Sequence, residues 1–243
     1  MFTAAKTSFA DFDSPPISEA TASGIVHRPQ RPFAAASLLA AAKQDPASHT
    51  PPRYALIEHD CATRVVAEKF ISRCFARSFG ARVAAFMPRL FSVQRSDGTV
   101  CGAFGLRSAQ RPLFIEHYLD RPIEQAIGAS AGIPVERRSI VEVGHFSGAF
   151  PGTMRALILL LIERLHSEGF EWVAFTGTHS LRNSFHRMGL FPLDLGEARI
   201  DAVPAESRAA WGSYYEYSPR VLAGRIRDGF VAFERGATQG ERA

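Results

Sequence analysis

A glutamate inside an apolar stretch is the first residue whose type and position suggest chemistry. Glu142 lies in Ile140–Phe146, whose alternation is typical of a strand. A buried carboxylate is costly unless it is paired or functional, and burial raises its pKa toward the range of a general base. In a regular strand Glu142 and Phe146 share one face, whereas Val143 and His145 share the other. Two interpretations of Glu142 follow, a general base or a partner in a structural ion pair. His145 is a second candidate base, or else a hydrogen-bonded structural residue.

The turn after this strand is a candidate anion site. Its sequence, His145–Arg155, includes Gly148, Gly152 and Thr153 immediately before an expected helix. Backbone N–H groups and the positive end of the helix dipole attract anions at such a position, and Arg155 adds positive charge. The turn lacks the Gly-Lys-Ser/Thr of a Walker loop. The alternative is an ordinary connection in which Thr153 caps the helix.

Two further clusters combine ionisable and aromatic side chains. Phe114–Asp120 contains Glu116 and a histidine, and Glu124 follows it. No two-histidine spacing such as HExxH accompanies them, so we expect no metal. We expect an acidic patch that attracts a substrate amine or, for Asp120 and Glu124, a solvated surface. The second cluster, Trp211–Tyr217, is expected either to line a substrate or acyl pocket or to form a closing strand of the core, and the strand is favoured.

These side chains must be positioned by an ordered set of elements. Periodicity predicts strands at Tyr54–Glu58, Leu90–Gln94, Val100–Leu106, Ile140–Phe146 and Glu171–Thr176, and helices at Ala62–Phe79, Pro122–Ala129, Thr153–Glu168 and Ser180–Met188. In the first helix, Val66, Phe70, Cys74 and Phe75 are expected to face the core. Asp-Gly between the second and third strands predicts a hairpin. The strand–helix–strand unit Ile140–Thr176 predicts a right-handed crossover between parallel strands, so the class is α/β, or α+β with a mixed sheet.

Length and composition exclude several classes of protein. The chain has 243 residues, is 46% hydrophobic and 21% charged, and carries a net charge of +4. This composition is typical of a globular domain and not of a disordered, collagen-like or coiled-coil chain. The positive excess is too small to indicate nucleic-acid binding. Three cysteines without CxxC spacing favour a reducing compartment and no structural zinc.

The ends of the chain differ in composition from its centre. Residues 1–52 are rich in Ala, Ser, Thr and Pro and are expected to be disordered or loosely structured. Residues 53–233 are expected to form the folded domain, and residues 234–243 a flexible tail. No apolar run is long enough to span a membrane. Phe33–Ala42 has the composition of a signal-peptide core, but the leader before it carries acidic residues, so we expect a cytoplasmic protein.

Four separated blocks carry a resemblance to a known family. They are Phe114–Asp120, Ile140–Phe146, Glu171–Thr178 and Trp211–Tyr215. Together they resemble the thermostable hemolysin family over about Arg73–Arg227. The order of elements also looks like the GNAT N-acyltransferase superfamily. That resemblance implies a mixed, mostly antiparallel sheet in which a central parallel pair of strands splays apart to admit the pantetheine arm of acyl-CoA.

The chain departs from the superfamily pattern in its donor site. The pyrophosphate turn is only loosely echoed by Ser147–Thr153, Phe185 matches the tyrosine that often serves as general acid, and Thr178 roughly matches an asparagine. The strand Gly102–Arg107 and the mid-strand glutamate Glu142 also look like those of acyl-homoserine-lactone synthases, which take acyl chains from acyl carrier protein. By that likeness a set of arginines is expected either to meet an acidic carrier protein or to be a solvated basic face: Arg107, Arg111, Arg137 and Arg138.

The resemblance implies an acyltransferase that moves an acyl group from acyl-CoA or an acyl-phosphopantetheine carrier to an amine of a small molecule. Glu142 is the expected base, with His145 and Glu116 as further catalytic candidates. The residues expected to hold the donor are Phe146, Ser147, Gly148, Gly152, Thr153, Arg155, Thr176 and Thr178. Those expected around the acceptor are Tyr118, Trp211, Tyr214 and Tyr215. The alternatives are a membrane-active lytic protein, which the family label implies, and a non-catalytic sensor of acyl thioesters.

Overall fold

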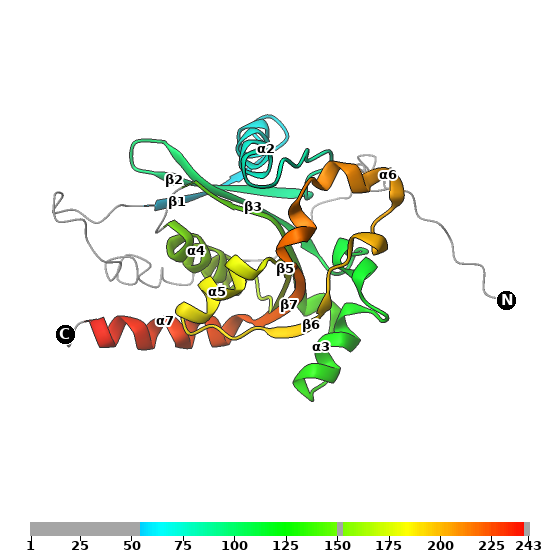
Figure 1. Ribbon diagram of the computed structural model, residues 1–243. Coiled ribbons are helices and arrows are strands. Elements are labelled where there is room, and N and C mark those ends of the chain that lie inside the picture. The colour runs from blue at the N-terminus through cyan, green and yellow to red at the C-terminus, as the bar shows by residue number, and fades with distance from the viewer. Residues whose placement is uncertain (1–53, 150–152, 241–243) are drawn as a thin grey trace, which may run out of the picture.

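The computed structural model describes residues 54–149 and 153–240, which contain one seven-stranded sheet (Figure 1). Its strands are β1 (Tyr54–His59), β2 (Arg89–Arg95), β3 (Val100–Ser108), β4 (Ile140–Gly148), β5 (Trp172–Gly177), β6 (Leu193–Glu197) and β7 (Arg220–Arg225). They lie in the order β1-β2-β3-β4-β5-β7-β6, and only β4 and β5 pair in parallel. This mixed, mostly antiparallel sheet confirms the predicted fold class.

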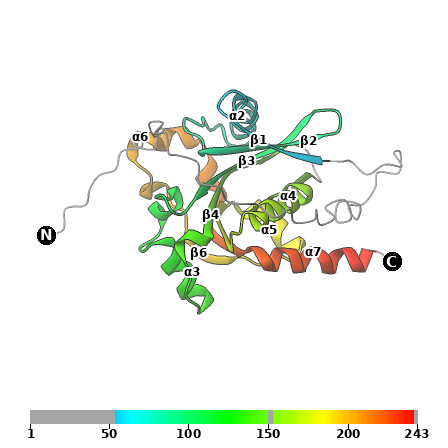
Figure 2. The same cartoon turned by 180° about the vertical axis from the view of Figure 1, so that it is seen from behind.

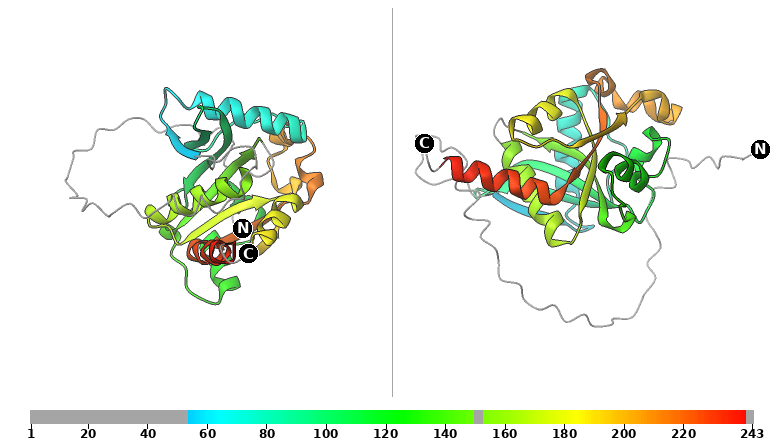
Figure 3. Two further views of the ribbon diagram at one scale, coloured as in Figure 1. Left: turned by 90° about the vertical axis from the view of Figure 1, so that its left-hand side faces the viewer. Right: turned by 90° about the horizontal axis from the view of Figure 1, so that it is seen from below.

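Helices cover both faces of the sheet (Figures 1 and 2). The helices are α2 (Val65–Phe79), α3 (Ile123–Ala131), α4 (Thr153–Ser167), α5 (His179–Arg187), α6 (Ala205–Arg208) and α7 (Ile226–Gly240). Short 3-10 turns are η2 (Phe114–Tyr118), η3 (Arg137–Ser139), η4 (Ile200–Ala202), η5 (Ala209–Trp211) and η6 (Tyr214–Tyr217). Helix α2 lies on one side of the sheet, and α4, α5 and α7 lie on the other (Figure 3).

The core is divided by the sheet into clusters on its two faces. On the α4 face, Leu157 and Leu161 of α4 pack with Phe104 of β3 and Phe175 of β5. On the opposite face, α2 packs on β2 and β3, while α3 packs on β4, β5 and β7. Because the β4–β5 pair has helices on both faces, its side chains are buried alternately above and below.

Helix α2 ends where the sequence predicts, but the prediction that Val66 faces the core is wrong. Gly80 closes the helix in the left-handed conformation, at φ 63°, and its N–H bonds to the carbonyl of Ala76. Val66, expected in the core, is 42% exposed, and Ala67 and Ile71 are buried in its place. Both sets have a spacing of three to four residues around Phe70, so periodicity alone does not choose between them.

The aromatic segment Trp211–Tyr217 is not the closing strand that the sequence favours. It forms η5 and η6, and the chain turns sharply between them at Gly212, at φ 52° and ψ −130°. The Ser213 N–H donates to the carbonyl of Phe79 at 2.8 Å, which ties the turn to the end of α2. The strands on this side of the sheet are β6 and β7 instead.

The length of α7 differs from the prediction for the end of the chain. Helix α7 continues to Gly240, past residue 233, where the flexible tail was expected to begin. Among the described residues, none of the helices combines the length and the apolar character needed to cross a membrane.

Candidate active site

Strands β4 and β5 separate part-way along their length. They pair from Ile140 opposite Trp172 to Val143 opposite Phe175, and no further pairing joins their described residues. Strand β4 nevertheless continues to Gly148, and β5 to Gly177. The splayed parallel pair expected from the resemblance is therefore present, and facing backbone edges of two strands are left without a strand partner.

A β-bulge in β4 accounts for this separation. Gly144 lies opposite Gly105 of β3, but Ser147 lies opposite Ala103, so two residues of β4 oppose one residue of β3. His145, within the bulge, has a positive φ of 56°. A bulge bends its strand and increases the local twist, which turns the end of β4 away from β5.

The bulge also overturns the predicted orientation of two side chains. His145 was expected opposite Glu142, but its ring contacts Phe75 and Phe86 on the α2 face, where Glu142 also lies. Phe146 was expected beside Glu142, but it packs into the cluster on the α4 face. The extra residue of the bulge breaks the alternation of a regular strand, which the prediction assumed.

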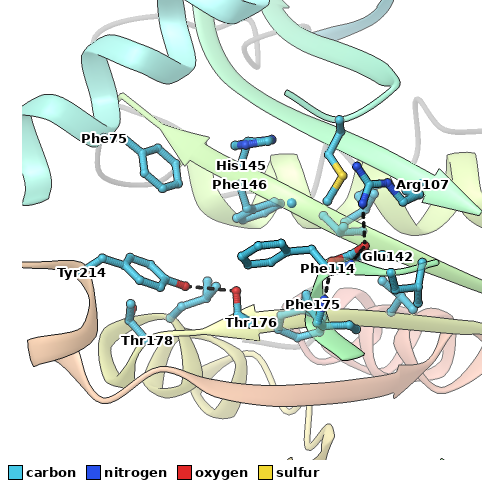
Figure 4. A pocket seen from close by; sticks show the side chains of 18 of the residues that line it. Phe75, Arg107, Phe114, Glu142, His145, Phe146, Phe175, Thr176, Thr178 and Tyr214 are labelled. Carbon is cyan, nitrogen blue, oxygen red and sulfur yellow. Dashed lines mark hydrogen bonds and ion pairs between the residues drawn. The ribbon is translucent and has the colours of Figure 1, made fainter. Parts of the chain in front are cut away.

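A cavity of about 2060 Å³ reaches both faces of the sheet through this region. On the α2 face the wall of the cavity is largely aromatic and includes Phe75, Phe86, Met87, Phe114, Trp211 and Tyr214. On the α4 face the wall contains both aliphatic and aromatic side chains, among them Met154, Ile158, Leu161, Phe175 and Phe185. Figure 4 shows several of these side chains around the opening. Single-ligand pockets usually measure about 300–1,000 Å³, so this cavity has room for more than one ligand.

Glu142 is buried on the α2 face beside the separation of the strands. It is 1% exposed, and its Oε2 and Oε1 accept backbone N–H bonds from Phe114 and Ile115, each at 3.2 Å. The Nη1 of Arg107, the residue directly across on β3, lies 4.0 Å from its Oε2. Burial raises the pKa of Glu142 to about 7, although Arg107 and the two backbone bonds oppose the rise. Glu142 therefore exchanges a proton near neutral pH.

His145 is held in its neutral form. Burial is the main cause that lowers its pKa to about 4, and the nearby charge of Arg107 adds to this effect. Its Nδ1 is buried and has no hydrogen-bond partner among the described residues. A ring that is neutral at pH 7 and packed between Phe75 and Phe86 serves as part of the cavity wall.

Glu116 is engaged in a structural network. Its carboxylate pairs with Arg137 at 2.6 Å and accepts backbone N–H bonds from Leu113 and Ile123. Burial would raise the pKa of Glu116, but these bonds outweigh it and lower the pKa below its usual range. Because Arg137 also pairs with Glu124, the network joins η2, α3 and η3. Neither Glu116 nor Glu124 is an isolated surface carboxylate.

The four arginines proposed for a carrier protein do not form one basic face. The side chain of Arg107 points toward Glu142 and is 11% exposed, and Arg137 is bound by Glu116. Arg138 is exposed and paired with Glu136. Sequence proximity suggested a shared surface, but β3 and η3 direct these side chains to different places.

Aromatic side chains from η2, η5 and η6 close the cavity on the α2 face. The ring of Trp211 stacks on Phe114 at 5.8 Å between centroids. The Tyr214 hydroxyl donates to Oγ1 of Thr176 at 3.1 Å (Figure 4). The hydroxyls of Tyr118 and Tyr215 share a hydrogen bond of 2.6 Å, and Tyr118 lines the cavity. Burial raises the pKa of Tyr118 and of Tyr214, so both hydroxyls remain protonated.

The expected anion turn is only partly described, because Gly152 lies outside the described residues. Thr153 is buried and begins α4. Arg155, expected to add charge to the turn, lies with its guanidinium 5.2 Å from the ring centre of Phe233 in α7. The hydroxyl of Ser147 bonds to the carbonyl of His145 within β4. Thr178 lies at the start of α5, makes no side-chain cap bond and lines the cavity.

Met87, which no sequence motif marks, occupies the space above two glycines. A Cβ on Gly144 would lie 2.3 Å from Met87 Cε, and a Cβ on Gly105 would lie 2.3 Å from Met87 Cβ. Glycines at facing positions of β3 and β4 therefore allow the loop after α2 to pack closely on the sheet. The glycines of these two strands were the available signal, but the loop that covers them carries no motif.

Comparison with known proteins identifies the family. The family model described as thermostable hemolysin matches residues 57–230, which is most of the chain. The chain belongs to the thermostable hemolysin family. For this family member no match is found among curated proteins.

Solved structures resemble this thermostable hemolysin family member at low sequence identity. FeeM, an N-acyl amino acid synthase from uncultured soil microbes, is 11% identical with a TM-score of 0.50, over 74% of this chain and 94% of its own. BjaI, a CoA-dependent acyl-homoserine lactone synthase solved with SAM and isopentyl-CoA, is 13% identical at 0.48, over 79% and 100%. A GCN5-related N-acetyltransferase from Kribbella flavida is 15% identical at 0.41, over 71% and 97%. The match to FeeM, at a TM-score of 0.50, shows that the two chains share a fold.

Proposed function

We propose that this chain is an acyltransferase that moves an acyl group from a pantetheine thioester to an amine of a small molecule. The observation that carries the proposal is the separation of β4 and β5 beside the buried carboxylate of Glu142, with a cavity that reaches both faces of the sheet. The fold shared with an N-acyl amino acid synthase makes acyl transfer the reaction class to test first.

The pantetheine arm fits the separated strands by its chemistry. Beyond Val143 and Phe175, the facing edges of β4 and β5 have no strand partner within the described residues. Backbone N–H and C=O groups that are buried need hydrogen-bond partners, and the two amides of a pantetheine arm supply them in strand-like form. We infer that Phe146–Gly148 holds the arm on one side and that Thr176 and Thr178 line it on the other.

The carboxylate of Glu142 would act as general base. With a pKa of about 7 it is largely ionised at slightly alkaline pH and still able to accept a proton from an amine. As the amine nitrogen attacks the thioester carbonyl, Glu142 takes its proton, the C–N bond forms, and the C–S bond breaks. The thiolate leaves with the arm and is protonated from solvent. Backbone N–H groups near the bulge would polarise the carbonyl oxygen.

The acceptor would enter on the α2 face, where Trp211 and Tyr214 line the cavity. Tyr215, expected to contact the acceptor, packs against these two rings and does not itself line the cavity. In this account Tyr118 fixes Tyr215 through the shared hydrogen bond. Glu116 holds η2 in place, and η2 supplies the two backbone N–H groups that bind Glu142. In this account Glu116 acts as a positioning residue, and His145 forms part of the cavity wall.

The test is release of free thiol from acyl-CoA and from acyl carrier protein, each with a panel of amines. Glu142→Gln should lower the rate about 100-fold or more. Glu163→Gln is the matched control, because burial also raises the pKa of Glu163 but its side chain does not line the cavity. Equal rates for wild type and Glu142→Gln would remove Glu142 as the base.

Two other functions would give different results in the same experiments. Leakage of liposomes in the absence of any thioester would favour a membrane-active protein. Saturable binding of acyl-CoA without thiol release would favour a sensor. No thiol release from either donor with any amine would overturn the proposed acyltransferase.

A further inference from the structure

Arg107 and Glu142 form a pair of opposite charges inside the cavity. They lie directly opposite each other on β3 and β4 and on the same face of the sheet. Their side chains are 11% and 2% exposed, and both line the cavity. The distance of 4.0 Å between Arg107 Nη1 and Glu142 Oε2 is long for such a pair, since charge-assisted bonds usually measure about 2.7–2.9 Å. Figure 4 shows both side chains beside Phe114 at the opening.

Other charged side chains of the cavity wall either form short ion pairs or are exposed to solvent. Arg64 binds Glu68 at 2.6 Å, and Glu116 binds Arg137 at 2.6 Å. Arg82 and Arg111 are exposed at the rim. Arg107 and Glu142 thus bring opposite charges into the cavity wall, 4.0 Å apart, at a largely buried position.

We propose, on the basis of the proposed function, that the acceptor is an α-amino acid whose carboxylate binds Arg107 while its amine faces Glu142. The amine and carboxylate of an α-amino acid are joined through one carbon, so they can meet two side chains whose charged atoms are 4.0 Å apart. A guanidinium has five N–H donors in a planar fork that matches a carboxylate, so it can bind one while keeping further contacts.

Electrostatics favours this acceptor over a simple amine. A protonated amine without a carboxylate would bring a second positive charge next to Arg107 in a buried site, where charges are weakly screened. A zwitterion adds no net charge and places each of its charges beside the opposite one. The neighbouring rings of Phe86, Phe114 and Trp211 would then contact the side chain, which favours apolar amino acids.

The chemistry of the step follows from this orientation. Glu142 accepts one proton from the α-ammonium, and the neutral nitrogen then bonds to the thioester carbonyl carbon. As the C–S bond breaks, the second proton leaves the nitrogen and protonates the departing thiolate, which is released as the thiol. The carboxylate of the amino acid stays bound to Arg107 and is unchanged. The product is an N-acyl amino acid.

The experiment compares matched acceptors in the thiol-release assay. The acceptors are leucine, phenylalanine and methionine, each against its methyl ester and its decarboxylated amine. For wild type, kcat/KM should be about 10-fold or more higher for the amino acid, since a hydrogen bond to a charged group contributes about 1.5–3 kcal/mol. In Arg107→Gln this ratio should fall toward one, and Arg107→Lys should give an intermediate ratio. Arg138→Gln, at an exposed ion pair away from the cavity, should keep the wild-type ratio.

Each contrary outcome has its own meaning. Wild-type use of amines or esters as efficiently as amino acids would overturn the inference and leave the acyltransferase standing, even where the Arg107 variants do not fold. If Arg107→Gln lowered kcat/KM equally for amino acids, esters and amines, Arg107 would act only through Glu142, and the inference would be overturned. An absence of thiol release from every donor and acceptor would overturn the proposed function itself.

Discussion

Replacing Glu142 with glutamine should change how the stability of the protein depends on pH. Burial raises the pKa of this carboxyl from an ordinary 4.5 to about 7. Between these values the folded protein keeps the proton while the unfolded chain loses it. The folded state therefore binds more protons, so wild-type stability falls as pH rises through this window. The variant has no carboxyl at this position and lacks that loss.

The size of the effect follows from the two pKa values. At 1.36 kcal/mol for each pKa unit, the difference between 4.5 and about 7 corresponds to about 3 kcal/mol. The glutamine amide also faces two backbone donors with one acceptor oxygen, which costs stability at every pH. Only the part of the stability difference that changes with pH reports the ionisation.

The assay is urea unfolding of both proteins at about pH 4.5 and about pH 8. The variant should gain about 3 kcal/mol relative to wild type between the two conditions. Glu116→Gln is a control of opposite sign, to be measured below pH 4.5. The pKa of Glu116 is lowered from 4.5, so wild type should lose stability relative to that variant as pH falls below 4.5. A difference between wild type and Glu142→Gln that does not change with pH would refute the burial of an ionisable carboxyl.

Three glycine substitutions test the packing around the site. Gly105→Ala should destabilise the protein by about 1–3 kcal/mol in chemical unfolding, because its Cβ would meet the Cβ of Met87 near the backbone. Gly144→Ala should cost less, because its Cβ meets the flexible end of the same side chain; equal costs would contradict the close packing of Met87 on both glycines. Gly212→Ala should be the most destabilising, because φ is positive and its Cβ would lie 2.1 Å from the carbonyl oxygen of Phe79; a neutral effect would contradict the described turn.

The sequence predicts the strands from β1 to β5 better than the strands β6 and β7 at the other edge of the sheet. The hairpin of β2 and β3 and the unit from β4 to β5 follow from Asp-Gly and from long periodic segments. Strands β6 and β7 are short, and Leu193–Glu197 and Arg220–Arg225 do not alternate cleanly, so they gave no clear signal. Long-range pairing sets their places, with β7 beside β5 and β6 beside β7.

The candidate site also has features that the sequence predicts and features that depend on the fold. Glu142 could be recognised from the sequence because a carboxylate in an apolar strand is costly to bury unless it is paired or functional. The structure buries it fully. The orientation of His145 could not, because the bulge depends on which residues of β3 pair with β4. The same register places Arg107 opposite Glu142, a pairing that sequence spacing does not reveal. The ion pair of Glu116 also needed the fold to bring η2 and η3 together.

The most direct measurement of the central claim is a crystal structure with a stable thioether analogue of an acyl-CoA. The account predicts that the pantetheine arm lies between β4 at residues 144–148 and β5 at residues 176–177, with the carbon in place of the thioester carbonyl next to the carboxylate of Glu142. An analogue bound elsewhere, or β4 and β5 paired along their whole length in that crystal, would contradict it.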